Sequence, residues 1–307
     1  MEMGRLAPHV LCMSMQKPYI GRFAPTPSGF LHFGSLTAAL ASFLDARAHQ
    51  GTWLVRIEDT DPPREVPGAS AAILKTLETY GLEWDGEVLY QSKRHDAYQA
   101  VIDQLLRQGL AYYCRCSRKQ LSQLPIYPGT CRNALLGPED AAVRIRVPEL
   151  TYSFEDHLQG TFSQHLGREL GDFVIKRRDG YFAYQLAVVL DDALQGITDV
   201  VRGADLLDNT PRQLYLQELL GLPGVRYLHL PLIVQEDGHK LGKTYRSAPL
   251  PPTQVTPLLI KALRALGQPV ADELLDASAP ELLRWAIAHW DSQKIPKTLT
   301  LAEAKLA

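Results

Sequence analysis

The feature that most constrains this chain is a turn-rich stretch at residues 21–35, which reads GRFAPTPSGFLHFGS. A short apolar segment precedes it, and residues 36–49 show the apolar spacing of an amphipathic helix. A helix that begins directly after such a turn presents backbone N–H groups and the positive end of its dipole, so the stretch favours an anion site. Gly34 would let a ligand approach the backbone, and His32 could donate to a phosphate oxygen. An ordinary strand-to-helix turn is the alternative, while dinucleotide-binding and Walker patterns do not fit.

Composition and charge narrow the class of protein. The 307 residues are 46% hydrophobic and carry a net charge of −2, which suits a globular chain without a global affinity for nucleic acid. No apolar run approaches the roughly 18 residues of a membrane-spanning helix. Three of the four cysteines are bunched, which fits a reducing compartment and a metal better than a secreted disulfide scaffold. We expect a cytoplasmic protein, acting as a monomer.

Short strands alternate with helices, which predicts an α/β fold with a doubly wound parallel sheet. The clearest elements are a buried strand at 52–57, a helix at 184–194 and a strand at 228–234. A further helix is expected at 93–108, with Ser92 as its N-cap.

Breaks in this alternation divide the chain into five segments. The sheet pattern stops where the cysteines begin, resumes later, and gives way to helical patterns at the end. The expected segments are a loose N-terminal extension (1–17), the first half of the α/β domain (18–110), a small α+β insertion (111–180), the second half of the α/β domain (181–244) and a helical C-terminal region (245–307).

Two later motifs add candidate chemistry. Residues 55–61 read VRIEDTD, and acidic or hydroxyl residues just beyond a strand lie where open α/β sheets place ligand groups. Residues 240–244 read KLGKT, and Lys240 and Lys243 on this loop could reach phosphates as charge develops during displacement at phosphorus. Alone, such a loop is usually a solvated turn.

Taken together, GRFAPTPSGFLHFGS, VRIEDTD and KLGKT resemble the motifs of class I aminoacyl-tRNA synthetases of the glutamyl/glutaminyl branch, over about residues 19–244. His32 to Ser35 stands at the HIGH motif and KLGKT at the KMSKS motif. The resemblance implies a Rossmann-like catalytic domain that uses ATP with Mg²⁺. It implies that His32, Gly34, Lys240 and Lys243 bind ATP, and that His32 and Lys243 act in catalysis, Lys243 stabilising the phosphates as pyrophosphate leaves.

The same resemblance implies an amino-acid site. Glu58 would bind the substrate's ammonium group, Arg22 and Thr26 would contact the amino acid, and Tyr184 and Arg202 would read its side chain. A guanidinium can clasp a carboxylate with two parallel hydrogen bonds, so Arg202 favours glutamate over glutamine. Taken alone, Arg202 could equally be an ordinary ion-pair residue.

The cysteines form a candidate metal site, in which Cys114, Cys116, Tyr127 and Cys131 give the pattern C-x-C-x10-Y-x3-C. Three closely spaced thiolates fit a structural Zn²⁺ with four ligands, with buried free cysteines as the alternative. The residues leave the fourth ligand open between Tyr127, His157 and water. A shortened branch of the family has a zinc site with the same spacing, and this resemblance implies Tyr127.

The end of the chain favours that branch. A full glutamyl-tRNA synthetase continues into an anticodon-binding domain, for which residues 245–307 are too few. The branch activates glutamate without tRNA and transfers it to queuosine at the wobble position of tRNA(Asp). The implied partners are therefore glutamate, ATP and queuosine-containing tRNA(Asp), with basic residues near the cysteines contacting RNA phosphates. The alternatives are a minimal glutamyl-tRNA synthetase that charges the tRNA 3′ end and a catalytically silent tRNA-binding paralogue.

Three positions depart from the family pattern. Ser35 replaces the second histidine of HIGH, Thr26 replaces a serine near the amino acid, and Gly242 replaces the middle serine of the lysine loop. These changes are expected to alter rate and affinity more than the type of reaction.

Overall fold

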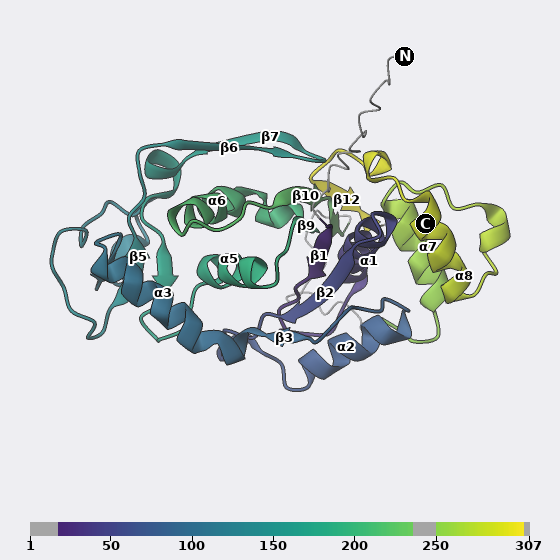
Figure 1. Cartoon of the computed structure of the whole chain (residues 1–307), viewed down its shortest axis with the longest axis horizontal. Helices are drawn as coiled ribbons and strands as arrows, with labels where there is room; N and C mark the ends of the chain where they lie inside the picture. Colours follow the sequence, from purple (N-terminus) through teal and green to yellow (C-terminus); the bar gives the residue numbers. More distant parts are fainter. Residues whose placement is uncertain (1–17, 236–249, 304–307) are drawn as a thin grey trace, which may run out of the picture.

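The computed structural model describes residues 18–235 and 250–303 (Figure 1). Two sets of parallel strands lie side by side at its centre, β3-β2-β1 from the first half of the chain and β9-β10 from the second, and we call them together the central sheet. The junction is between β1 and β9, where the Thr198 N–H donates to the Ile20 carbonyl at 2.9 Å. The strands are β1 (Ile20–Phe23), β2 (Thr52–Ile57), β3 (Leu89–Tyr90), β9 (Asp199–Gly203) and β10 (Arg226–Leu230).

Helices lie on two sides of the central strands. In Figure 1, α1 (Phe33–Ala48) lies with α7 (Val255–Ala265) and α8 (Ala279–His289) to one side of the central strands. On the other side lie α5 (Tyr184–Leu194) and α6 (Thr210–Leu219). Leucines along α1 are fully buried against β1 and β2, and this removal of apolar surface from water fixes the helix on the sheet.

A second sheet lies at the far end of the molecule and is antiparallel, in the order β4-β5-β8. Its strands are β4 (Ala111–Cys114), β5 (Ala142–Ile145) and β8 (Val174–Lys176), and its core is shared with α3 (His95–Arg107) and α5.

A hairpin of β6 (Thr151–Asp156) and β7 (Gly160–His165) reaches back from this region to the central sheet, where Asp156 pairs with Tyr227 of β10. It therefore brings a residue from the middle of the chain to the central sheet.

None of the helices in the described part of the chain is long and apolar enough to cross a membrane. The remaining helices and strands complete the described residues. They are η1 (Pro62–Arg64), α2 (Ala69–Thr79), η2 (Gln91–Arg94), α4 (Arg118–Leu121), η3 (Leu166–Leu170), η4 (Ala204–Asn209), β11 (Leu232–Val234), η5 (Asp272–Leu274), η6 (Ser292–Lys294) and β12 (Thr300–Ala302).

Two sequence expectations were wrong in detail. Ser92 does not cap α3, because its N–H and hydroxyl both donate to the Asp59 carboxylate, at 2.9 and 2.6 Å, and the helix begins at His95 after a 3₁₀ turn. The strand expected at 228–234 is two strands, β10 and β11, separated at Pro231, which has no N–H to donate to a ladder.

Candidate active site and metal centre

The first turn of α1 forms part of a pocket of about 260 Å³ at the carboxyl end of β1. Thr26, His32 and Gly34 line it together with Asp205. His32 is the N-cap of α1, and its Nδ1 accepts the Ser35 N–H at 3.4 Å. In a neutral ring this places the proton on Nε2, which makes that nitrogen a hydrogen-bond donor. A helix N-terminus and such a donor together suit a phosphate-bearing ligand.

Gly34 leaves room for the neighbouring His32 ring. A Cβ at this position would lie 3.2 Å from the His32 ring, so a side chain would displace the imidazole. Lys240 and Lys243, the other residues expected to bind ATP, lie outside the described residues.

A buried cluster of four charges, hereafter the Asp192 cluster, lies between β1, β2 and α5. Asp192 accepts hydrogen bonds from Arg22 Nε at 3.1 Å and from Arg56 Nη2 at 2.8 Å. Arg56 Nη2 also lies 3.6 Å from Glu58 Oε1. Two arginines thus face two carboxylates. The free-energy cost of burying these charges is offset by the attraction between them.

Two atoms of this cluster are buried without a hydrogen-bond partner among the described residues, Arg56 Nε and an oxygen of Glu58. Glu58 is the acceptor of the two. Its Oε1 is buried and accepts no hydrogen bond from the described residues. Burial raises the pKa of Glu58 to about 7, although Arg56 and Arg22 act in the opposite direction. A buried carboxylate oxygen that lacks a donor suits a cationic group such as an ammonium.

Arg202 has a different environment. Its Nε donates to His229 Nε2 at 3.0 Å, its Nη1 to Gln213 Oε1 at 2.9 Å, and its Nη2 to Thr210 Oγ1 at 2.8 Å. Nη1 also lies 3.4 Å from the Tyr184 hydroxyl. The side chain is buried, yet within the described chain it makes no ion pair with a carboxylate. Such a cation suits an anionic ligand.

The expected amino-acid residues share one electrostatic environment. The charges of Arg22 and Arg202 both lower the pKa of Glu58, and both partly offset the burial that raises the pKa of Tyr184. Thr26 lies instead with His32 in the pocket. The structure therefore brings Arg22, Glu58, Tyr184 and Arg202 together in one group, none of which lines the pocket that holds Thr26.

Sequence reasoning missed the partners that hold this group. Arg56, Asp192 and His229 were not singled out, although each is at most 4% exposed. A charged residue inside the apolar strand at 52–57 was a usable signal for Arg56. The other two occur in a helix and a strand, where nothing in the local pattern separates them from ordinary core positions.

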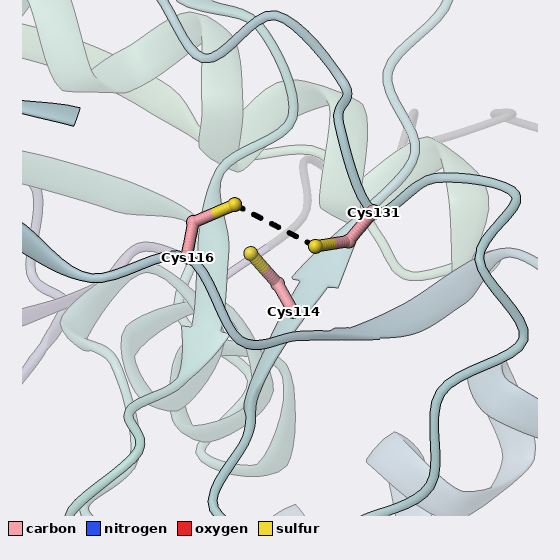
Figure 2. Close-up of side chains that lie close together, drawn as sticks. All are labelled: Cys114, Cys116 and Cys131. Carbon is pink, nitrogen blue, oxygen red and sulfur yellow. Dashed lines mark hydrogen bonds between the residues drawn. The ribbon is translucent and has the colours of Figure 1, made fainter. Parts of the chain in front are cut away.

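The three cysteines meet beside β4, as Figure 2 shows, with their sulfur atoms directed toward one another. Every pair of sulfurs lies within 4.8 Å, and Cys116 Sγ is 3.5 Å from Cys131 Sγ. Tetrahedral Zn²⁺ with bonds of about 2.3 Å would hold sulfurs about 3.8 Å apart, so the spacing fits.

Tyr127 joins the cysteines. Its hydroxyl lies 3.4 Å from Cys114 Sγ and accepts the Cys131 N–H at 2.8 Å. Sulfur and oxygen ligands of one tetrahedral Zn²⁺ lie about 3.5 Å apart, so the distance between the Tyr127 hydroxyl and Cys114 Sγ is compatible with a shared ion. His157 is not in this cluster but lines a separate cavity beside Tyr227 and Thr198.

Arg144 supplies positive charge to the same cluster. Its Nε donates to Cys114 Sγ at 3.3 Å, and its guanidinium lies 3.9 Å from the centre of the Tyr127 ring. Burial opposes ionisation of Cys114, but hydrogen bonds from Tyr127, the Cys116 backbone and Arg144 outweigh it and lower the pKa of that thiol. Burial and the Cys131 hydrogen bond raise the pKa of Cys116 to about 11.

Comparisons with known proteins agree with this fold and these motifs. A family profile described as tRNA synthetases class I (E and Q), catalytic domain, matches residues 20–127 and 124–249. A solved glutamate tRNA ligase from Elizabethkingia meningosepticum, in complex with its amino acid, superposes with a TM-score of 0.78 at 26% identity, covering 93% of this chain and 67% of that one.

Similarity by sequence is higher still. A protein named glutamyl-Q tRNA(Asp) synthetase from Ectopseudomonas mendocina is 70% identical over 95% of this chain and 100% of its own length. Proteins of the same name from Pseudomonas syringae pv. tomato and Pseudomonas aeruginosa are 67% and 68% identical, each covering 95% of this chain and 100% of its own length. The chain therefore belongs to the class I aminoacyl-tRNA synthetase family and, within it, to the glutamyl-Q tRNA(Asp) synthetases.

Proposed function

We propose that this protein uses ATP to activate glutamate without tRNA and transfers the glutamate to queuosine at the wobble position of tRNA(Asp). The relatives of the same family, at 66–70% identity, support the reaction and the RNA. The observation that carries the choice of glutamate is Arg202, a buried cation whose hydrogen bonds in the described chain all go to neutral groups.

In the first step an oxygen of the glutamate α-carboxylate attacks the α-phosphorus of ATP. The bond from that phosphorus to the oxygen bridging to the β-phosphate breaks, and glutamyl-adenylate and pyrophosphate form. His32 and Gly34 would contact the phosphates in the pocket, with Lys240 and Lys243 stabilising the departing charge. The protein contributes positioning and charge stabilisation, without a covalent intermediate on the chain.

Glutamate would be held by both buried groups. Its ammonium would meet the Glu58 oxygen that has no donor, beside Arg22, with Thr26 at the edge of the pocket. Its γ-carboxylate would meet Arg202 and the Tyr184 hydroxyl. Because a neutral amide cannot supply the charge that Arg202 requires, glutamine would bind less well.

In the second step a hydroxyl of queuosine attacks the acyl carbon of the adenylate. An ester bond forms, the hydroxyl proton is lost and AMP leaves. The basic side chains near the cysteines are proposed to contact phosphates of the tRNA.

Two metal ions are proposed, one for the structure and one for the use of ATP. Zn²⁺ held by Cys114, Cys116, Tyr127 and Cys131 would link β4 to the loop that follows it, which is a structural contribution. Mg²⁺ would accompany ATP and screen its phosphates. We propose that the reaction takes place in the cytoplasm and that the protein is a monomer.

The test uses labelled glutamate, ATP and tRNA(Asp), with and without queuosine, followed by nuclease cleavage to locate the label. Label on the anticodon fragment, only when queuosine is present, is the expected result. Label at the 3′ end irrespective of queuosine would mean a minimal glutamyl-tRNA synthetase. No glutamate-dependent ATP–pyrophosphate exchange would mean a tRNA-binding paralogue without catalysis.

A further inference from the structure

Three buried side chains form a hydrogen-bonded line behind the amino-acid site. Asp156 ends β6, His229 lies on β10 and Arg202 on β9. His229 Nδ1 lies 2.6 Å from Asp156 Oδ2, and His229 Nε2 lies 3.0 Å from Arg202 Nε. The Asp156 and His229 side chains have no solvent exposure. The line joins the hairpin of the middle region to the residue proposed to read the substrate.

The partners fix the protonation of His229. The Arg202 Nε–H can only donate, so His229 Nε2 must present its lone pair. The ring proton is then on Nδ1, where it is donated to Asp156. Burial and the charge of Arg202 lower the pKa of His229, against the effect of Asp156, which agrees with a neutral ring.

Asp156 is itself rigidly held. Its Oδ1 accepts the N–H groups of Leu158 at 3.0 Å and Gln159 at 2.9 Å, and the carboxylate also accepts the His229 N–H at 3.1 Å from Oδ2. Burial would raise the pKa of Asp156, but these hydrogen bonds and that from the His229 ring outweigh it and lower the pKa. A carboxylate fixed by the β6–β7 turn thus orients the imidazole.

We propose that Asp156 and His229 are positioning residues that hold the Arg202 guanidinium for the substrate γ-carboxylate and thereby set the preference for glutamate. The proposal rests on the proposed function, in which Arg202 binds that carboxylate. With Nε held by His229 and Nη2 held by Thr210, Nη1 donates to Gln213 Oε1 at 2.9 Å. The same Nη1 lies 3.4 Å from the Tyr184 hydroxyl, the other group proposed to read the side chain.

The neutral imidazole of His229 keeps the Asp156 carboxylate out of direct contact with Arg202. A carboxylate in direct contact with Arg202 would neutralise it and compete with the substrate. His229 transmits the orientation fixed by Asp156 while leaving the guanidinium charge for the ligand. By contrast, Arg22 contacts Asp192 directly, so its charge is already compensated.

The test compares His229→Leu, His229→Gln and Asp156→Asn in glutamate-dependent ATP–pyrophosphate exchange. Tyr19→Phe is the matched control, because it removes another buried hydrogen bond to a carboxylate, that of Asp45, outside this site. In His229→Leu, kcat/KM for glutamate should fall on the order of tenfold to a hundredfold, as for a misplaced binding group. The KM for ATP should stay within about twofold. His229→Gln can accept from Arg202 Nε and should recover most of the loss.

Asp156→Asn preserves shape and should give a smaller loss of the same kind, with reduced discrimination between glutamate and glutamine. If His229→Leu does not fold, Asp156→Asn decides. Equal losses for glutamate and ATP, or a normal KM for glutamate in the folded variants, would overturn the proposal.

Arg202→Ala, measured alongside, separates the positioning role of Asp156 and His229 from the role of Arg202 in binding glutamate. If it abolishes glutamate use while the His229 and Asp156 variants act like Tyr19→Phe, only the positioning role is wrong. If Arg202→Ala itself activates glutamate normally, the glutamate assignment in the proposed function fails as well.

Discussion

The Asp192 cluster and the surroundings of Arg202 are both buried, yet they compensate positive charge in opposite ways. In the first, Arg22 and Arg56 contact Asp192 directly and Glu58 lies nearby. In the second, the guanidinium meets an imidazole, an amide and two hydroxyls. In the Asp192 cluster the protein itself supplies the counterions, whereas the charge of Arg202 is available to a ligand.

This difference separates stability from recognition. A neutralised buried cluster destabilises the fold when one partner is removed, because the remaining charge is left without compensation. A buried cation that lacks a counterion contributes little to stability, but it offers a ligand carboxylate a strong, charge-assisted contact. We expect substitutions in the two regions to have distinct effects.

The largest effect on stability is expected from Asp192→Asn. Arg22 and Arg56 would lose their common carboxylate, and the free energy of unfolding should fall by about 3–5 kcal/mol. Asp199→Asn is the control, because its partner Arg226 is 57% exposed and can be solvated when the carboxylate is removed, so the loss there should be smaller. Urea unfolding measures the free energy of unfolding of both variants. Equal losses would contradict the expectation that the Asp192 cluster stabilises the fold more than the Asp199–Arg226 pair does.

Arg202→Ala should have the largest effect on recognition. Glutamate activation should weaken by about 2–5 kcal/mol in kcat/KM, because the substrate carboxylate would lose its charged partner. Stability should change less than in Asp192→Asn, since no protein carboxylate is left unpaired. Exchange kinetics and urea unfolding on one preparation test both statements, and intact glutamate activation would refute the role of Arg202.

A pH dependence should come from Glu58. Its pKa of about 7 means that the free protein takes up a proton there as the pH falls through 7, and the protonated group cannot pair with an ammonium. Glutamate affinity should therefore be constant above this pH and fall by about tenfold, or 1.4 kcal/mol, per pH unit below it. Calorimetry without ATP measures this, and Glu58→Gln should remove the dependence. A flat profile in the unmodified protein would exclude Glu58 as the ammonium partner.

The smallest effect on the active site is expected from Cys116→Ser, which lies in neither region. The variant should lose bound Zn²⁺ and loosen the segment around β4, while glutamate activation stays within about twofold of the unmodified protein. Metal analysis and proteolysis follow the first change, and exchange follows the second. Unchanged zinc content would argue against the cysteine cluster as the metal site.

Elements with a strong local pattern could be predicted from sequence. The strand at Thr52–Ile57 and the helix at Tyr184–Leu194 have the bounds expected, because apolar periodicity alone decides them. Ser92 failed as a cap because a residue distant in sequence, Asp59, competes for its donors. A local signature cannot reveal such competition.

The same limit applies to the site. Arg22, Glu58, Tyr184 and Arg202 were proposed from motif resemblance, and the structure groups them. Their supporting residues depend on contacts across the fold: Asp156 and His229 are 73 positions apart, and Arg22 and Asp192 are 170 apart. A histidine in an apolar strand is indistinguishable from a core residue until its partners are known.

The role of Arg202 as the partner of the substrate γ-carboxylate is tested most directly by a crystal structure of the protein with glutamate bound. We expect the γ-carboxylate in hydrogen-bond contact with Arg202 and Tyr184, the ammonium on Glu58, and Asp192 still paired with Arg22 and Arg56. A γ-carboxylate bound to another cation, with Arg202 still surrounded only by its neutral partners, would contradict it.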